Sequence, residues 1–451
     1  MGGGNGGGRG LLVACAAVAA WAASGASVAA AAGPGGVTSA PDDPAFRAHS
    51  QWGLVQAGFP AAWCRSTGAG ALIVVIDTGI AAAHPDLAGK LAGEAAVHQG
   101  AVTSGPGTAS DDSGHGTHVA GIAAAVTGNG IGIAGAAPDA RLYAIKVLFA
   151  DSSGGTAREQ GTRTDLVQAI DYATTMVAPS WPGPVVLNLS IGAADAGSSD
   201  SLSGTSSADV DGAIERAAAA GLGVAVAAGN AGTAAIGGDA VAAGAALSVG
   251  ALDQNGSVAP YSPTAGVSIF AAGGTASAPD RYTGTGILST WLHSSSGDYA
   301  WMAGTSMAAP HVAAALAMLM STGLSNQDAY ARLLSTADAQ RRMHIDVALG
   351  STAPCGVASP APPRAAVRPA RVAPPSRAAA GAPAQMAGTP SATAASSASP
   401  VALPLTAGPR IVAAAAPVSG GGHPALTRIA LGLGALLLLW LVVVRRALRS
   451  P

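Results

Sequence analysis

The sequence contains few charged residues, few aromatic residues and few cysteines. Charged residues make up 10% of the chain, the formal net charge is -2, and lysine and arginine form no run that could bind a polyanion. We therefore expect no nucleic-acid partner. The chain also lacks an internal repeat of fixed period, so we expect one sizeable core within its 451 residues. Its three cysteines allow one disulfide bond at most.

Both ends of the chain carry apolar segments. Arg9 precedes a run of small and apolar residues that ends at a Gly-Pro turn, which is typical of an export signal over residues 1–33. Residues 425–444 are apolar enough and long enough to form a transmembrane helix. The arginines of the tail 445–451 predict that this tail stays in the cytoplasm. The rest of the chain is then outside the cell, with residues 351–424 as a Pro-, Ala- and Ser-rich linker.

The linker also contains a motif for a different kind of anchoring. The segment LPLTA at 403–407 resembles a sortase recognition sequence, and a hydrophobic segment with a basic tail follows it. The gap to that segment is longer than in such signals. We therefore expect a retained single-pass membrane anchor, with cell-wall attachment or release as the alternatives.

Between residues 51 and 350, short apolar runs alternate with small-residue or amphipathic stretches. The runs predict buried strands and the stretches predict helices. The strands are expected at 71–76, 142–148, 185–189 and 223–227, and the helices at 116–126, 165–176, 209–220 and 306–320. This alternation predicts a three-layer α/β fold with a mainly parallel central sheet. Residues 34–50 are left as a short N-terminal extension.

One glycine motif in this region is misleading. Residues 130–135 match the dinucleotide-binding pattern GxGxxG. However, they follow a helical stretch rather than a strand, and a turn with Pro138 follows them rather than a helix. We therefore predict a tight loop and no nucleotide site.

The strongest chemical signal is the segment GTSMAAPHV at 304–312. It predicts a turn into an apolar helix, with Ser306 at the helix start and Pro310 in or next to the first turn. A serine there lies beside unpaired backbone N–H groups and the positive end of the helix dipole, both of which stabilise an oxyanion. An isolated serine at such a position is more often a simple N-cap. A nucleophilic serine also needs a base and a group that orients the base.

Two further segments supply these groups. The segment DSGHGTHVAG at 112–121 places His115 at another helix start, and IDTG at 76–79 places Asp77 at the carboxyl end of an apolar strand. That end of a parallel sheet is where reacting groups collect. Taken alone, Asp77 could cap a turn, and His115 and His118 could be metal ligands or a surface pair. No further ligands with a recognisable spacing accompany them.

Together, the segments VVIDTGI, HGTHVAGIAAAV and GTSMAAPHVAAA resemble the subtilisin family of serine proteases, also called subtilases. The resemblance lies in the local sequence of each segment and in the chain order Asp, His, Ser. The resemblance spans residues 51 to about 350. It implies that Asp77 orients the imidazole and that His115 acts as general base and then general acid. It further implies that Ser306 is the nucleophile of an acyl-enzyme mechanism.

The same resemblance implies an oxyanion hole and a groove for an extended peptide. Asn230, in the segment AAGN, corresponds to the family asparagine whose amide acts with the backbone N–H of Ser306. A strand of the family pairs with the substrate main chain, and small residues form the floor of its main pocket. The corresponding residues here are Ser190, Ile191 and Gly192 for the strand, and Ala227, Ala228 and Gly229 for the floor.

Several features depart from the family or add to the resemblance. The region between Asn230 and Val249 lacks the prolines that are usual there, and the segment 33–51 is too short for the folded propeptide of many secreted relatives. Asp86 and the loop at Asn129 resemble two halves of the family's structural calcium site, although a solvent-facing turn is an equally simple interpretation.

The two cysteines outside the export signal, Cys64 and Cys355, are a pair that an exported protein can oxidise to a disulfide.

The sequence thus predicts a secreted, membrane-anchored, monomeric serine endopeptidase that hydrolyses extended peptide segments and needs no cofactor for its chemistry. The alternative is a catalytically silent surface module that binds peptides in the same groove. The enzyme is favoured because all four chemical positions, Asp77, His115, Ser306 and Asn230, are filled.

Overall fold

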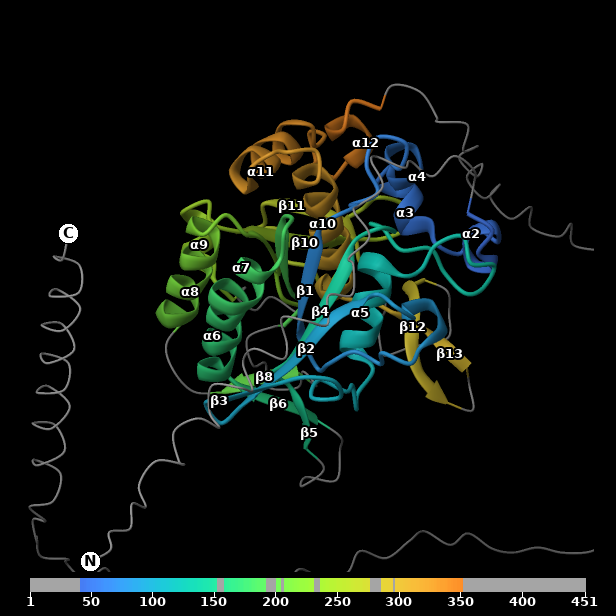
Figure 1. Cartoon of the computed structure of the whole chain (residues 1–451). Helices are drawn as coiled ribbons and strands as arrows, with labels where there is room; N and C mark the ends of the chain where they lie inside the picture. The colour runs from blue at the N-terminus through green and yellow to red at the C-terminus, as the bar shows by residue number, and fades with distance from the viewer. Residues whose placement is uncertain are drawn as a thin grey trace, which may run out of the picture. The chain divides into compact units, whose positions relative to one another are not determined.

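Figure 1 shows a computed structural model of the chain. It describes residues 41–151, 158–191, 200–203, 207–230, 236–275, 285–294 and 297–351, all within the first of two compact units, residues 1–369. The expected export signal, transmembrane segment and tail lie outside these residues, as do the linker after residue 351, Gly192 and Cys355. Among the described residues, no helix has both the length and the apolar character needed to cross a membrane.

An eight-stranded sheet forms the middle layer of this unit (Figure 1). Its strands lie in the order β11-β10-β9-β7-β1-β4-β2-β3, and every neighbouring pair is parallel except β2 with β3. The strands are β1 (Leu72–Asp77), β2 (Leu91–His98), β3 (Ala101–Ser104), β4 (Arg141–Lys146), β7 (Val185–Leu189), β9 (Gly223–Ala227), β10 (Leu247–Leu252) and β11 (Ile269–Ala272). The prediction of a mainly parallel sheet is confirmed, and the four predicted strands are the adjacent strands β9, β7, β1 and β4.

Helices cover both faces of the sheet, each over its own hydrophobic core. On one face lie α5 (His115–Ala124) and α10 (Thr305–Met320), which pack against Val75, Val186 and Ala225. On the other face lie α6 (Arg163–Tyr172) and α8 (Ser207–Ala219), which pack against Val74 and Leu187 (Figure 1). Alternate residues of one strand point to opposite faces, which is why Val74 and Val75 belong to different cores.

Shorter elements surround these layers. The helix α6 continues as a π-helical turn (Ala173–Val177), and the hairpin of β12 (Ile287–Ser294) and β13 (Gly297–Met302) packs on α5. A second small sheet contains β5 (Phe149–Asp151), β6 (Arg158–Thr162) and β8 (Asp200–Ser203). The remaining helices are the 3-10 turn η1 (Pro85–Leu87), α7 (Ala178–Ser180), α9 (Gly238–Ala242), α11 (Asn326–Ser335) and α12 (Ile345–Ala348).

The N-terminal segment 41–50, assigned above to an extension, packs onto the domain. Phe46 in α2 (Pro44–Arg47) is buried against Trp63, with 5.7 Å between ring centroids, and the carboxylate of Asp43 accepts the N–H of Gly128. The helices α3 (Trp52–Gln56) and α4 (Phe59–Ala62) follow directly. Residues 41–50 thus pack onto the domain predicted for residues 51–350.

The GxGxxG segment at 130–135 is a loop, as predicted. It has no helical turn, and Gly130 and Gly132 both adopt positive φ, which only glycine adopts readily.

Candidate active site

Asp77 is the last residue of β1, and its carboxylate holds His115. The residue is fully buried. Its Oδ1 accepts the backbone N–H of Thr78 at 2.7 Å and lies 2.7 Å from Nδ1 of His115. A carboxylate can only accept, so Nδ1 carries the proton and Nε2 is left as the basic nitrogen of the ring.

Two glycines allow the strand end and the helix start to approach so closely. A Cβ on Gly116 would lie 2.2 Å from the carbonyl oxygen of Gly79 and 3.1 Å from Oδ1 of Asp77. Gly79 has φ of 108°, and a Cβ there would lie 2.3 Å from the carbonyl oxygen of Ala109. A side chain at Gly116 would push α5 away from the end of β1, and one at Gly79 would displace the loop at Ala109 that precedes α5.

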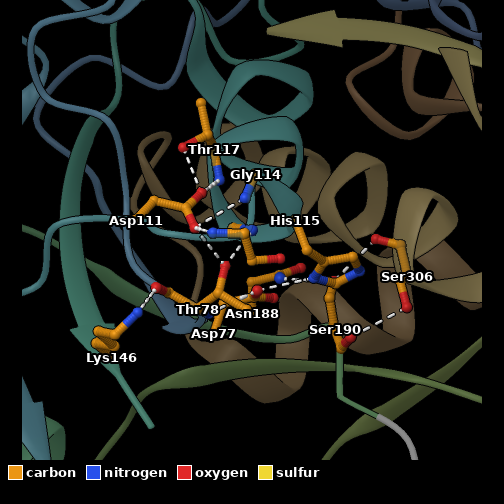
Figure 2. A network of polar contacts seen from close by, with 12 residues as sticks. Asp77, Thr78, Asp111, Gly114, His115, Thr117, Lys146, Asn188, Ser190 and Ser306 are labelled. Atoms are coloured by element: carbon orange, nitrogen blue, oxygen red, sulfur yellow. Dashed lines mark hydrogen bonds and ion pairs between the residues drawn. The ribbon is translucent and has the colours of Figure 1, made fainter. Parts of the chain in front are cut away.

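A carboxylate that the sequence analysis did not single out ties the same two elements together. Oδ1 of Asp111 accepts the hydroxyl of Thr78 at 2.9 Å and the N–H groups of Ser113 and Gly114. Its Oδ2 accepts both the N–H and the hydroxyl of Thr117 (Figure 2). Asp111 thus joins the residue after Asp77 to the first turn of α5. Its position four residues before His115, at the positive end of a helix, is the signal that could have revealed it.

Lys146 supports this corner from the neighbouring strand. It ends β4, lies opposite Asp77 in the sheet register, and is buried. Its ammonium group donates to the carbonyl oxygen of Thr78 at 2.6 Å and to Asp112 at 2.7 Å (Figure 2). These contacts satisfy a buried charge and fix the turn that follows Asp77.

Ser306 lies in the first turn of α10, and Figure 2 shows its side chain pointing toward the imidazole of His115. The Ser306 hydroxyl donates to the carbonyl oxygen of Ser190 at 3.0 Å. The structure therefore brings together the three residues that the sequence predicts as a triad, from segments far apart in the chain. The ring nitrogen that can accept the serine proton is the one that does not face Asp77.

Pro310 lies inside α10, five residues after Thr305, in the turn next to the first one. A proline at this position has no N–H for the carbonyl oxygen of Ser306 four residues earlier. That oxygen instead accepts the hydroxyl of Ser190 at 2.8 Å. The irregularity of the helix is thus located at the predicted nucleophile, Ser306.

Asn230 follows β9 and faces the start of α10. Its Oδ1 accepts both the N–H of Thr305, at 3.0 Å, and the Thr305 hydroxyl, at 3.2 Å. Two donors on one oxygen fix the orientation of the amide, so the Nδ2 group is directed away from them. Nδ2 and Oδ1 lie 3.6 Å and 3.7 Å from the position of a Cβ on Gly304, so the amide is beside the N-terminus of the helix. This placement suits a donor to an oxyanion, and Thr305 is the residue that sets it.

Two other histidines on the same helices are buried and structural. Burial lowers the pKa of His118 to about 3 and that of His311 to about 4, so both are neutral at pH 7. Nε2 of His118 lies 3.1 Å from the carbonyl oxygens of Ile287 and Ala300 in the β12–β13 hairpin. A pair of metal ligands at His115 and His118 is therefore not formed. No group of three or more His, Cys, Asp or Glu residues in the described ranges could hold a metal ion.

The predicted substrate-binding residues turn their side chains inward. Ser190 contacts Ser306, while Ile191 is fully buried in the core beneath α6 and α8. Ala227 and Ala228 are also buried, and Gly229 has φ of 90°. Only the main chain of Ser190 and Ile191 is then left for a peptide, and the pocket floor stays a prediction.

The predicted calcium ligands Asp86 and Asn129 form hydrogen bonds with each other and with neighbouring groups. Oδ1 of Asp86 accepts the Asn129 amide at 2.8 Å, and its Oδ2 accepts the N–H of Ile133 and the hydroxyl of Tyr299. Oδ1 of Asn129 accepts the N–H of Ile131, so its N–H groups, not its oxygen, face Asp86. Asn129 does not fit a cation in this orientation.

A second carboxylate near this loop was missed by the sequence analysis. Asp43 is fully buried, and burial together with the charge of Asp86 raises the pKa of its carboxyl group. Within the described residues, neither Asp43 nor Asp86 forms an ion pair with Lys or Arg. The oxygens of both carboxylates already accept protein N–H or O–H groups, so a divalent cation, which prefers such hard ligands, would have to displace some of these donors.

Cys64 is disulfide-bonded. Its Sγ lies 4.0 Å from Oγ of Ser351, the last described residue, whose hydroxyl donates to the carbonyl oxygen of Ala61. The expected partner Cys355 follows four residues later, outside the described residues.

The arrangement has the parts needed for acyl transfer. It offers a hydroxyl beside an imidazole, a buried carboxylate that orients the imidazole, and amide donors at a helix N-terminus. None of these groups requires a bound cofactor for that chemistry.

Comparison with known proteins agrees with this geometry. The subtilase family model matches residues 68–352. The chain is 36% identical to thermitase of Thermoactinomyces vulgaris over 300 residues, which cover 66% of this chain and 91% of thermitase. It is 37% identical to subtilisin BL of Lederbergia lenta over 59% of this chain and 83% of that relative. Among solved structures, it is similar to a protease of Pseudoalteromonas arctica PAMC 21717, with a TM-score of 0.57 and 28% identity over 69% of this chain and 99% of that one.

Proposed function

Because the chain belongs to the subtilase family and is a serine-type endopeptidase, we propose that Asp77, His115 and Ser306 are its catalytic triad. The observation that carries the proposal is the 2.7 Å contact between Asp77 and Nδ1 of His115, with the Ser306 side chain directed at the same ring. His115 takes the proton of the Ser306 hydroxyl as that oxygen attacks the peptide carbonyl. It then gives the proton to the leaving amine, and water releases the acyl group by the reverse sequence.

Asn230 and the backbone N–H of Ser306 stabilise the oxyanion that forms on the attacked carbonyl. The substrate is an extended peptide segment, which pairs with the main chain at Ser190 and Ile191. The support for this assignment is that Thr305 binds Oδ1 of Asn230, so that the amide N–H groups are not used by Thr305.

Hydrolysis of a peptide library by the full chain tests the function. Wild-type protein should cleave internal peptide bonds, and Ser306→Ala should not. If folded wild-type protein binds peptides but releases no product, the chain is instead a silent binding module.

We further propose that the protein is exported, acts outside the cell and is held at the membrane by residues 425–444, as a monomer. The apolar segments at both ends and the arginines after the second one support this location. Mass spectrometry of the mature C-terminus should find the intact basic tail. An end at Thr406 would instead indicate sorting to the cell wall.

We also propose a structural calcium ion at Asp86 and Asp43. Calcium would neutralise two buried carboxylates, and the Asn129 amide would have to turn to offer its oxygen. Calcium should raise the Tm of wild-type protein but not that of Asp86→Asn, and an equal response of both proteins would exclude this site.

We propose in addition a disulfide between Cys64 and Cys355. Non-reducing peptide mapping should recover Cys64 joined to Cys355.

A further inference from the structure

The helix that carries the nucleophile is interrupted at one carbonyl group, and the structure shows what replaces the missing donor. In a regular helix, the N–H of residue 310 would bond to the carbonyl oxygen of residue 306. Pro310 has no N–H. The Ser190 hydroxyl fills this place, with its Oγ 2.8 Å from the carbonyl oxygen of Ser306.

Ser190 is itself held in position by a buried amide. Nδ2 of Asn188 donates to Oγ of Ser190 at 2.9 Å, so that the hydroxyl proton is directed to Ser306 (Figure 2). Asn188 is completely buried and Ser190 is 1% exposed. Within the described residues, Oδ1 of Asn188 has no hydrogen-bond partner. An unpaired buried amide oxygen is unfavourable. This cost indicates that the hydrogen bond from Nδ2 of Asn188 to Ser190 is important at this position.

The contact between Ser190 and Ser306 is reciprocal. The Ser306 hydroxyl donates to the Ser190 carbonyl oxygen at 3.0 Å, while the Ser190 hydroxyl donates to the Ser306 carbonyl oxygen. The hydroxyl and the carbonyl group of Ser306 are therefore both held by one residue at the neighbouring strand end. The peptide that carries the Ser306 carbonyl sets the tilt of the first helical turn, and with it the direction of the nucleophilic side chain.

We propose that Asn188 and the hydroxyl of Ser190 are positioning residues for the nucleophile, which supply to Ser306 the hydrogen bond that Pro310 removes from the helix. This inference rests on the proposed catalytic role of Ser306. It gives the Ser190 side chain a role distinct from the main-chain contact with the substrate.

The proposal predicts a specific pattern of loss and rescue. Ser190→Ala leaves the Ser306 carbonyl unpaired and should lower kcat by about 10- to 100-fold, with little change in KM, because the loss of a buried hydrogen bond affects attack rather than binding. Pro310→Ala restores an N–H within the helix. In the double variant this N–H should bond to Ser306 and return kcat to within about threefold of the Pro310→Ala protein.

Ser248→Ala is the matched control. Ser248 is another serine that is 1% exposed, on the nearby strand β10, and its hydroxyl has no partner among the described residues. Its removal should leave kcat unchanged. All values are divided by the concentration of sites titrated with a fluorophosphonate, so that unfolded protein does not contribute.

The possible results distinguish a failure of the proposed function from a failure of the positioning role. Inactive wild-type protein would contradict the proposed function, whereas active wild type with an unchanged kcat in Ser190→Ala would overturn only the positioning role. An equal loss in the single and double variants would also overturn it. If Ser190→Ala does not fold, Asn188→Leu, which has a similar size but no donor, must lower kcat. A normal kcat in that variant contradicts the proposal.

Discussion

The two faces of the central sheet are packed in different ways. On the face of α5 and α10, small residues let backbones approach closely, and a Cβ on Gly121 would lie 2.2 Å from the Thr290 hydroxyl. On the face of α6 and α8, larger aliphatic residues such as Leu166 and Ile214 fill the space. All the catalytic candidates lie with the first face. This contrast indicates that the site of fixed geometry lies where main chains are in close contact. The face of α6 and α8 contributes hydrophobic stability.

We expect the largest change in kcat when the buried Asp77 is replaced, and none when the structural buried aspartate Asp165 is replaced. Asp77→Asn should lower kcat by about 10⁴-fold, because the imidazole loses the acceptor that fixes its tautomer. Asp165→Asn on the other face is the control, since Asp165 is 2% exposed and accepts the N–H of Gly100 near the start of α6. It should lower the unfolding free energy and leave kcat unchanged. Equal losses of kcat in both variants would remove the distinction between the faces.

The next largest change is expected for one of two asparagine amides near helix starts, the exposed Asn230 and the buried Asn326. Asn230→Ala should lower kcat by about 100- to 1,000-fold with a small change in KM, a magnitude taken over from the equivalent asparagine of another subtilisin rather than calculated for this chain. Asn326→Ala is its control, because Asn326 bonds to the carbonyl oxygens of Ala218 and Leu222 instead. A loss in KM alone for Asn230→Ala would argue against an oxyanion-hole role.

A smaller effect tests the packing difference directly with two helical glycines. Gly121→Ala should destabilise the protein by about 1–3 kcal/mol or more, because the new methyl group meets hydroxyls of the hairpin. Gly212→Ala in α8 should stabilise it by up to about 1 kcal/mol, because only the flexible end of Arg216 lies near. Urea denaturation of both variants measures this. The same sign in both would contradict the proposed contrast.

The last effect is a dependence of stability on pH that arises from the catalytic face. The folded pKa values of His118, about 3, and His311, about 4, lie below the ordinary value of 6.5. The unfolded chain therefore binds protons first as the pH falls, and stability is lost from about pH 6.5 downward. Each histidine contributes up to about 1.4 kcal/mol per pH unit in that range. Denaturation curves between pH 7 and 4 should show a shallower loss for His311→Gln than for wild type, and an unchanged slope would exclude His311.

The sequence predicted the inner strands and the catalytic segments well, because both have strong local signals. The predicted helices 116–126 and 306–320 differ from α5 and α10 by two residues at most. The strands β2 and β3 were not predicted, since β2 is only partly buried, β3 is exposed, and neither has a continuous apolar run. The strand β10 is fully buried, but serine and glycine interrupt its apolar run.

The contacts that position the site could not be predicted, because they join residues distant in sequence. The bond of Ser190 to Ser306 spans 116 positions, and it exists because Pro310 leaves a carbonyl group unpaired. Likewise, Thr305 and Asn230 are 75 positions apart. A motif identifies which residues react, whereas their orientation depends on which strand ends lie side by side.

The most direct test of the central claim is the covalent labelling of full-length protein with a fluorophosphonate, followed by peptide mapping. We expect one adduct, on Ser306, that is absent from Ser306→Ala and strongly reduced in His115→Ala. The absence of an adduct on folded wild-type protein, or an adduct on another serine, would contradict it.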